Sequence, residues 1–172
     1  HGSIYEGRTE KMNRVMEEIS LVTNREKIKG TLSDVMKGAD VFIGLSAGGI
    51  VNRSMVKSMS CEPVVFAMAN PVPEIMPDEA RAAGAAVVAT GRSDFPNQVN
   101  NSMVFPGVFR GALDVRARNI NVQMKIAAAE AIAGFVGEKD LRPDYIIPGA
   151  LNYKVPAYVA AAVARSAMET GE

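Results

Sequence analysis

The fold is decided by residues 63–74, which read PVVFAMANPVPE. The part from Pro63 to Ala69 is a continuous apolar run with β-branched members, which predicts a strand covered on both faces of a parallel sheet. Asn70 and Pro71 follow at once, so an amide side chain stands where the strand ends. Open α/β sheets bind ligands at the carboxyl ends of their strands. Asn70 is therefore a candidate ligand contact, although Asn before Pro is also common in turns.

Similar patterns lie on both sides of this stretch. Residues 39–45 and 85–90 are predicted as further buried strands, and residues 54–59 and 77–84 as short helices between the three strands. The second of these helices starts with Pro and acids and ends with Gly, as helices often do. Strand and helix alternating over short links indicate right-handed parallel crossovers. The fold class is predicted as α/β, a Rossmann-like parallel sheet with flanking helices.

Other helices are expected before and after this sheet, and the whole of residues 1–172 is expected to be a single domain. Residues 91–104 are polar and long enough to form a functional loop. In residues 121–136 the apolar face is predicted to consist of Val122, Ile126, Ala129, Ile132, Ala133 and Val136. The remaining predictions are helices at 10–21, 31–38, 106–117 and 155–170 and an extended piece at 145–148, with apolar positions at Met12, Val15, Met16, Ile19 and Val22 in the first of these helices.

The composition excludes several classes of protein. Nineteen basic and nineteen acidic residues cancel, and 48% of the residues are apolar. No basic stripe points to nucleic acid and no run of apolar residues points to a membrane span, so neither is expected as a partner. The single Cys61 allows no internal disulfide and suits a cytoplasmic location. The only histidine is His1, which argues against Ser-His-Asp or Cys-His catalysis and a His-containing zinc site within the chain.

A glycine-rich loop and an asparagine pair are further candidate contacts. Residues 44–49 read GLSAGG after a strand, so their backbone N–H groups could face a phosphate or a ribose. The loop lacks the G-x-G-x-x-G spacing, and a simple tight turn is the alternative. Asn100 and Asn101 place two amides side by side, which could serve two ligands or form a helix N-cap or an Asx turn.

Charged residues near these loops are expected to have structural roles. Glu74 is interpreted as a solvated acid or a helix-start charge rather than a metal ligand, because no second carboxylate is spaced to join it. Four further charges could bind a carboxylate substrate through an arginine, but ion pairs that hold loop and helix together are the favoured interpretation. They are Arg92, Asp94, Arg110 and Asp114.

Several segments, taken in this order, resemble the malic enzymes of the small bacterial and archaeal type. They are IYEGR at 4–8, DVFIGLSAG at 40–48, residues 67–77, TGRSDFPN at 90–97, and the asparagine pair followed by FRGALD at 109–114. The resemblance implies oxidative decarboxylation of L-malate to pyruvate and CO2 with NAD or NADP and with Mg or Mn. It implies that Gly44, Ser46 and Ala47 lie along the dinucleotide, that Asn70 faces both its nicotinamide half and the substrate, that Asn100 contacts the cofactor, and that Asn101 binds a malate carboxylate.

Features of that family which the chain lacks are equally informative. The catalytic Tyr and Lys, the metal-binding carboxylates and the glycine-rich fingerprint with the first strands are not found in it, so no catalytic residue or metal ligand is assigned here. The chain is expected to be the C-terminal NAD(P)-binding part, inactive when isolated, a partner of the N-terminal part and a homo-oligomer. Arg8 and Lys11 could favour the NADP phosphate or be surface charges.

Two other functions compete with this interpretation. The first is a non-catalytic nucleotide-binding module, which would have the same sheet but no catalytic activity. An amino-acid dehydrogenase-like domain has a similar sheet, but the Asn100–Asn101 segment argues against it.

Overall fold

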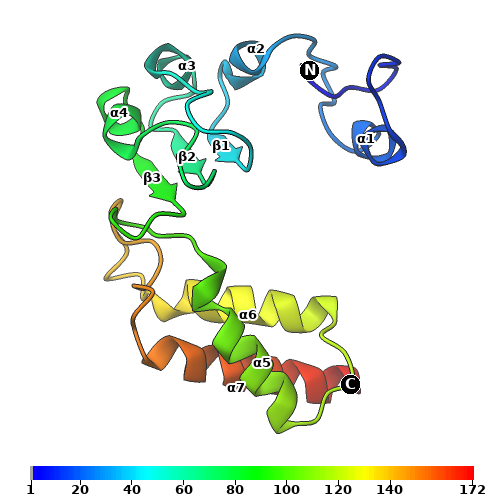
Figure 1. The fold of residues 1–172 in the computed structure, drawn as a ribbon, viewed down its shortest axis with the longest axis vertical. Helices are drawn as coiled ribbons and strands as arrows, with labels where there is room; N and C mark the ends of the chain where they lie inside the picture. Colours follow the sequence, from blue (N-terminus) through cyan, green and yellow to red (C-terminus); the bar gives the residue numbers. More distant parts are fainter. Residues whose placement is uncertain (1) are drawn as a thin grey trace.

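A computed structural model describes residues 2–172, and it contains a three-stranded parallel sheet that lies above the C-terminal helices in Figure 1. The strands are β1 (Val41–Gly44), β2 (Val64–Ala67) and β3 (Val87–Thr90), in the order β1-β2-β3. Val65 pairs with Phe42 on one side and with Val88 on the other. Helix α3 (Arg53–Lys57) joins the first two strands and α4 (Pro77–Ala82) joins the last two. The predicted α/β fold class and the three strands are confirmed.

The helices cover only one face of this sheet. Phe42, Val65 and Val88 are buried in one hydrophobic cluster with side chains of α2 (Leu32–Met36), α3 and α4. On the other face, Val41 is 50% exposed and Ile43 is 61% exposed. Val64 and Phe66, which pair with Val41 and Ile43, are half-buried, so the coverage of both faces predicted for the strand at 63–69 is only partial within this chain. Two right-handed crossovers that step in the same direction place both helices on the same side.

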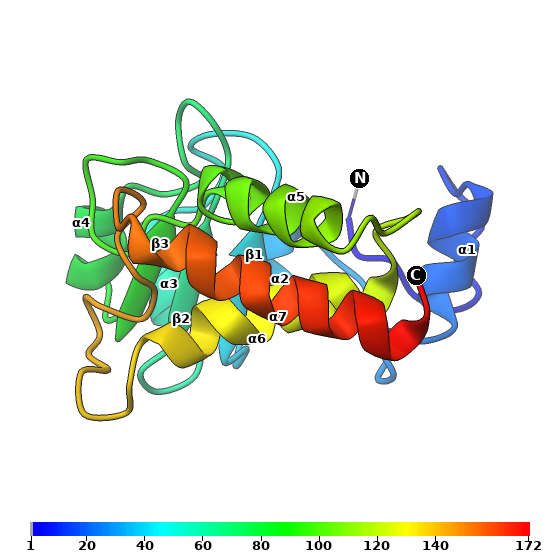
Figure 2. The same ribbon diagram turned by 90° about the horizontal axis from the view of Figure 1, so that it is seen from below.

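A second unit of three helices follows β3 and has its own hydrophobic cluster. A short 3-10 helix, η1 (Asn101–Met103), leads into α5 (Phe105–Asp114), α6 (Val122–Phe135) and α7 (Lys154–Thr170). Helix α7 lies between the other two and packs against both (Figure 2). The three C-terminal helices expected from the sequence are confirmed.

The buried face of α6 agrees with the predicted one only in part, because Val136 is buried and Ile132 packs against the cluster as predicted, but other positions differ. Met124, Ala128 and Ala131 are buried, whereas Val122 is 58% exposed and Ile126 is 52% exposed. The helix is rich in alanine and apolar around most of its circumference, so its sequence does not single out one stripe. The side that α7 covers is decided by packing.

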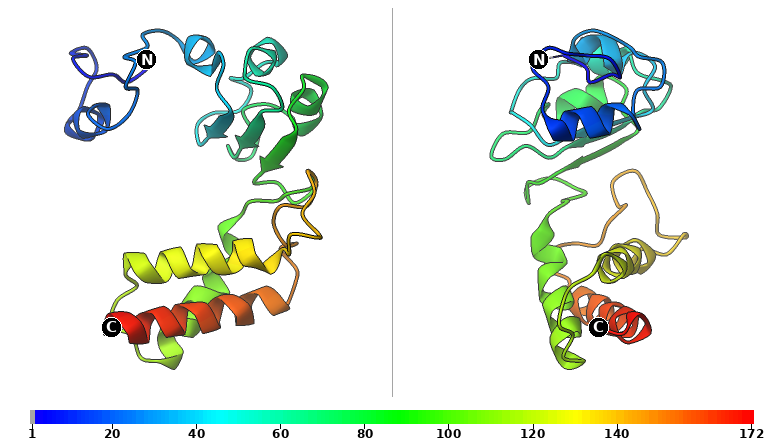
Figure 3. Two further views of the ribbon diagram at one scale, coloured as in Figure 1. Left: turned by 180° about the vertical axis from the view of Figure 1, so that it is seen from behind. Right: turned by 90° about the vertical axis from the view of Figure 1, so that its right-hand side faces the viewer.

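The N-terminal segment lies apart from the sheet at one end of the molecule (Figure 3). It carries α1 (Arg14–Ser20), which begins at Asn13, whose side chain accepts a hydrogen bond from the Met16 N–H. Val15 and Ile19, two of the expected apolar positions, are exposed. The amphipathic spacing of α1 therefore has no matching core within the described chain. Of the helices between residues 2 and 172, none is long and apolar enough to cross a membrane.

Candidate nucleotide site

The carboxyl ends of the three strands lead into the loops that carry the predicted site residues. Because the strands are parallel, these ends share one edge of the sheet, and β3 points toward the helical unit (Figure 1). The loop after β1 contains Ser46 and Ala47, the loop after β2 contains Asn70, and the chain after β3 reaches Asn100 and Asn101. The topology brings Ser46, Ala47 and Asn70 to one end of the sheet, whereas Asn100 and Asn101 lie further along, where the chain enters η1.

A buried carboxylate joins the first two loops. Glu74 is fully buried, and its Oε1 accepts hydrogen bonds from the backbone N–H of Ser46 at 2.8 Å and from the Ser46 hydroxyl at 2.9 Å. Its Oε2 accepts a third from the backbone N–H of Ala69 at 3.0 Å. The interpretation of Glu74 as a solvated acid or helix-start charge is wrong. Neutral amides and a hydroxyl satisfy the charge, an arrangement that residue types alone do not reveal.

The ionisation of Glu74 is set by two opposing influences. Burial, the largest single influence, acts to raise the pKa of the Glu74 carboxyl. The hydrogen bonds from the backbone of Ala69 and Ser46 and from the Ser46 hydroxyl together outweigh it, so the pKa lies below its ordinary value. Glu74 is therefore ionised at neutral pH.

Glycines make room for this carboxylate and for the neighbouring loop. A Cβ on Gly44 would lie 2.5 Å from the Glu74 carboxyl carbon, and a Cβ on Gly48 would lie 2.7 Å from the Cβ of Val72. Only glycine fits such approaches without displacement of the neighbour. The backbone N–H of Gly49 also donates to the carbonyl of Pro73 at 3.0 Å. The loops after β1 and β2 thus form one interlocked unit.

The predicted ligand contacts differ in how free their side chains are. Ser46, Ala47, Asn70 and Asn101 are exposed, and within residues 2–172 the amides of Asn70 and Asn101 have no hydrogen-bond partner. Asn100 is half-buried and is the N-cap of η1, since its Oδ1 accepts from the Ser102 N–H at 2.9 Å. The N-cap alternative holds for Asn100, and its contact with a cofactor stays a prediction that rests on its NH2 group.

Comparison with known proteins identifies the family. Residues 2–168 match the family described as malic enzyme, NAD binding domain. The chain belongs to this malic enzyme family. It is 59% identical to the bifunctional malic/malolactic enzyme of Bacillus subtilis over 170 residues, which are 99% of this chain and 42% of that protein. It is 53% identical to the NAD-dependent malic enzyme of Geobacillus stearothermophilus, of which it covers 35%.

Solved malic enzymes share the fold. The structure from Entamoeba histolytica matches with a TM-score of 0.89 at 44% identity, over 99% of this chain and 36% of that one. The NAD-dependent malic enzyme of Thermotoga maritima matches with a TM-score of 0.87 at 46% identity, over 94% of this chain and 42% of that one. The chain spans about two fifths or less of the length of these relatives.

Asn97 links β3 to the segment before α7, a role that the sequence did not predict. Asn97 is 5% exposed, and its Nδ2 donates to the carbonyls of Val88 at 3.0 Å and Pro143 at 2.8 Å. Its Oδ1 accepts from the Ile146 N–H at 3.0 Å. It thereby ties β3 to the segment before α7. Its φ of 56° is a conformation that Asn tolerates better than most residues, so the residue type in this polar loop is the one sign of it in the sequence.

The nearby charges form the expected ion pairs, but each pair stays within its own segment. Arg92 pairs with Asp94 at 2.6 Å inside the loop, and Arg110 pairs with Asp114 at 2.9 Å along α5. The expectation that they hold loop and helix together is wrong. Arg8 donates to the backbone carbonyl of Ser3 at 2.7 Å, so part of its donor capacity is used locally.

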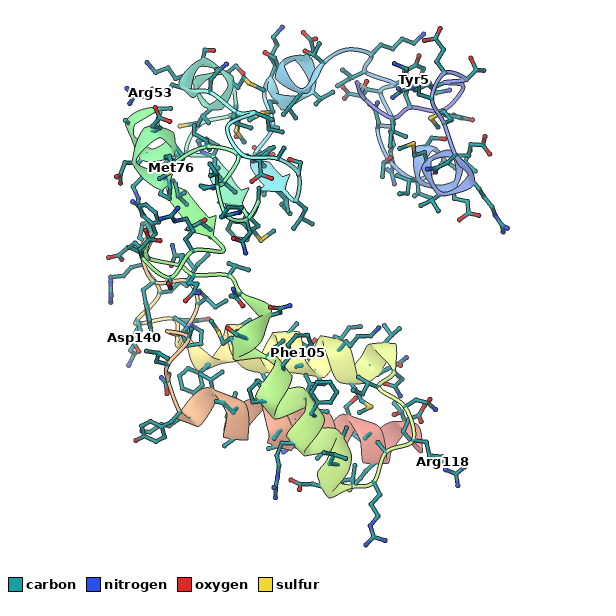
Figure 4. All side chains as sticks on the ribbon, in the orientation of Figure 1. Tyr5, Arg53, Met76, Phe105, Arg118 and Asp140 are labelled. Carbon is teal, nitrogen blue, oxygen red and sulfur yellow. The ribbon has the colours of Figure 1, made fainter. Side chains whose placement is uncertain are left out.

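Two large cavities, but no cluster of metal ligands, lie within residues 2–172. Within that range no group of three or more His, Cys, Asp or Glu side chains could hold a metal ion. One cavity of about 520 Å³ lies between α6 and α7 and is lined in part by Ile126 and Tyr158. Another of about 500 Å³ is lined by Arg53 and Met76 (Figure 4) beside the loops that Glu74 joins.

Proposed function

We propose that this chain is the NAD(P)-binding part of a malic enzyme that converts L-malate to pyruvate and CO2 by oxidative decarboxylation. One observation carries the proposal: the family match covers the same strand ends at which Ser46, Asn70 and Asn101 expose polar groups. Relatives named as NAD-dependent and as NADP-dependent malic enzymes both occur, so either dinucleotide is a candidate.

The residues of this chain would bind and orient the reactants. NAD or NADP, when bound, supplies the hydride acceptor. The free amide of Asn101 can donate to a malate carboxylate, and that of Asn70 can serve both the substrate and the nicotinamide half. The NH2 group of Asn100 remains for the cofactor. Holding malate in the correct orientation to the nicotinamide can lower the activation free energy by a large amount. Orientation of the reactants is therefore the contribution that we assign to this chain.

The metal of the reaction is not assigned to this chain. Mg²⁺ or Mn²⁺ would polarise the malate hydroxyl. The described residues provide no cluster of ligands for such an ion. Proton transfer and metal binding are accordingly assigned to the N-terminal part of the enzyme, which we propose as the partner of this chain.

The test is an assay of the full-length protein that carries this sequence. We expect reduction of NAD or NADP that depends on L-malate and Mn²⁺ and that yields one pyruvate for each reduced dinucleotide. Calorimetry with the dinucleotide alone serves as the companion measurement. Tight dinucleotide binding without malate turnover would instead establish a non-catalytic nucleotide-binding module.

Location and assembly are part of the same proposal. The single exposed Cys61 and the even balance of charges support a cytoplasmic protein. The exposed apolar side chains of β1 support a homo-oligomer. Cell fractionation and light scattering of the full-length protein test these two statements.

A further inference from the structure

The hydroxyl of Ser46 donates its hydrogen in one fixed direction. A serine hydroxyl has one hydrogen to donate and two lone pairs that accept. That hydrogen is directed at Glu74 Oε1, 2.9 Å away, while the residue itself is exposed. The side of the hydroxyl that faces a ligand therefore offers lone pairs and no hydrogen.

The surroundings of Glu74 hold this arrangement in place. Its Oε2 is bound by the Ala69 N–H, and the missing Cβ of Gly44 leaves the space that the carboxyl group fills. If the Ser46 hydroxyl turned toward a ligand, a buried charge would lose one of its donors, which is costly. The Ser46 hydroxyl consequently stays an acceptor toward the ligand.

The same contacts weaken this loop as a phosphate site. Phosphates are bound by free backbone N–H groups, and those of Ser46, Gly49 and Val51 already donate to Glu74 Oε1 and to the carbonyls of Pro73 and Glu74, which leaves those of Ala47 and Gly48. The buried negative charge of Glu74 adds repulsion. A ligand group that donates a hydrogen bond fits here better than a phosphate oxygen.

The position of Ser46 selects one half of the dinucleotide. The carboxylate that holds Ser46 also holds Ala69, the residue before Asn70. Asn70 is the residue that the proposed function places against the nicotinamide. Ser46 and Asn70 thus belong to one interlocked unit, which the proposed function sets beside the nicotinamide half of the ligand.

We propose, on the basis of the proposed function, that Ser46 Oγ accepts a hydrogen bond from a donor on the nicotinamide riboside half of the dinucleotide. The donor is a ribose hydroxyl or the carboxamide N–H, which share this chemistry. Glu74 is the positioning residue that makes Ser46 an acceptor, and it does not touch the ligand.

The first experiment measures Ser46→Ala in the full-length protein. The KM for NAD or NADP should rise about three- to tenfold, as expected for one lost hydrogen bond, while the inhibition constant of ADP stays unchanged. Ser46→Thr, which keeps a hydroxyl, should restore the KM. The matched control is Ser33→Ala, an exposed serine of α2. An unchanged KM, or an equal loss of ADP affinity, would overturn the proposal.

The second experiment identifies the donor. The 3-acetylpyridine analogue of NAD has a methyl ketone in place of the carboxamide and so lacks its N–H. If the donor is a ribose hydroxyl, Ser46→Ala raises the KM equally for NAD and for the analogue. If the donor is the carboxamide, only the KM for NAD rises. A rise for the analogue alone would contradict both forms of the proposal.

The third experiment tests the role of Glu74 by a double-mutant cycle. Glu74→Gln should raise the KM for NAD in the wild-type background and have a smaller effect in the Ser46→Ala background, because the two residues act on one contact. Additive effects would overturn the positioning role. If Glu74→Gln does not fold, the Ser46 variants still decide the proposal. Absence of malate turnover in the wild-type protein would be a failure of the proposed function instead, and direct NAD binding to the same variants would then decide the inference.

Discussion

Glu74 shows how a single carboxylate can organise a site from which it is hidden. Its oxygens accept from two residues on different loops, and it has no exposed surface. Replacement by Gln removes the charge and leaves one position with a donor facing the Ala69 N–H. We expect Glu74→Gln to lower the free energy of unfolding by about 1 to 3 kcal/mol at neutral pH.

The pH dependence of this loss has a definite sign. The folded-state pKa of Glu74 is lowered, so its contribution to stability is present above its ordinary value and is lost as the pH falls through the folded pKa. The stability difference between wild type and Glu74→Gln should therefore shrink below about pH 4. Urea unfolding at several pH values measures it, with Glu130→Gln on the surface of α6 as the control. A difference that stays constant into acid would show that the charge is irrelevant.

Asn101 and Asn100 are adjacent residues that differ in whether they have a structural role besides the proposed ligand contact. The free amide of Asn101 has no structural partner within residues 2–172, so Asn101→Ala in the full-length protein should lower kcat/KM for malate about ten- to a hundredfold and leave the melting temperature nearly unchanged. Asn100→Ala removes the cap of η1 and should lower stability by about 1 kcal/mol. Kinetics and melting curves of both variants separate the roles. Unchanged kinetics for Asn101→Ala would leave that residue without a function in binding.

What the sequence predicts at single residues depends on whether the signal is local. Asn70 and Asn101 are candidates because they follow strand and loop boundaries that periodicity marks, and their ligand contacts stay predictions. The structural roles of Glu74 and Asn97 could not be predicted, since their partners lie up to 49 residues away in the sequence. Hydrogen bonds of that span are made by the tertiary fold, and neither residue type nor spacing encodes them.

Most helices and strands were predicted close to their observed bounds, although the helix expected at 10–21 is observed only as Arg14–Ser20. The helix expected at residues 155–170 is observed as Lys154–Thr170, and the strand expected at 85–90 is observed as Val87–Thr90. The buried face of α6 was predicted only in part, because its alanines leave no clear stripe. Boundaries thus follow from local chemistry, whereas the choice of face requires knowledge of the neighbouring helix.

The contact between α5 and α7 depends on two glycines. A Cβ on Gly107 would lie 2.6 Å from the Cβ of Val159, and a Cβ on Gly111 would collide with the backbone carbonyl of Ala160. We expect Gly111→Ala to lower the free energy of unfolding by about 1 to 3 kcal/mol, despite the better helix propensity of alanine.

The matched control for this change lies on α6. Gly134 is also helical, but nothing lies within 4 Å of a Cβ placed there. Gly134→Ala should therefore raise stability by about 0.5 to 1 kcal/mol. Chemical unfolding of both variants provides the comparison. Equal effects of the two substitutions would show that helix propensity decides and that the close approach of α5 to α7 does not.

The molecule as a whole is asymmetric about its sheet. One face carries α2, α3 and α4, whereas the other leaves Val41 and Ile43 of β1 exposed, and β1 is also an edge strand of the described sheet. The fold class was predictable from the alternation of strands and helices. The open face was not, because an apolar strand has the same sequence whether a second layer covers it or another chain does.

This open face leads to a prediction for the 172-residue chain on its own. Exposed apolar side chains beside an unpaired strand edge favour association, so the chain should self-associate as its concentration rises. A lysine on an edge strand opposes such pairing, and Ile43→Lys should weaken association about tenfold or more, since an apolar side chain of this size contributes about 1.5 kcal/mol or more when buried. Leu151→Lys is the control, because Leu151 is 98% exposed in a loop far from the sheet in the sequence. Light scattering over a concentration series measures both variants. A strictly monomeric wild-type chain, or equal weakening by the two lysines, would show that the open face of β1 does not mediate association.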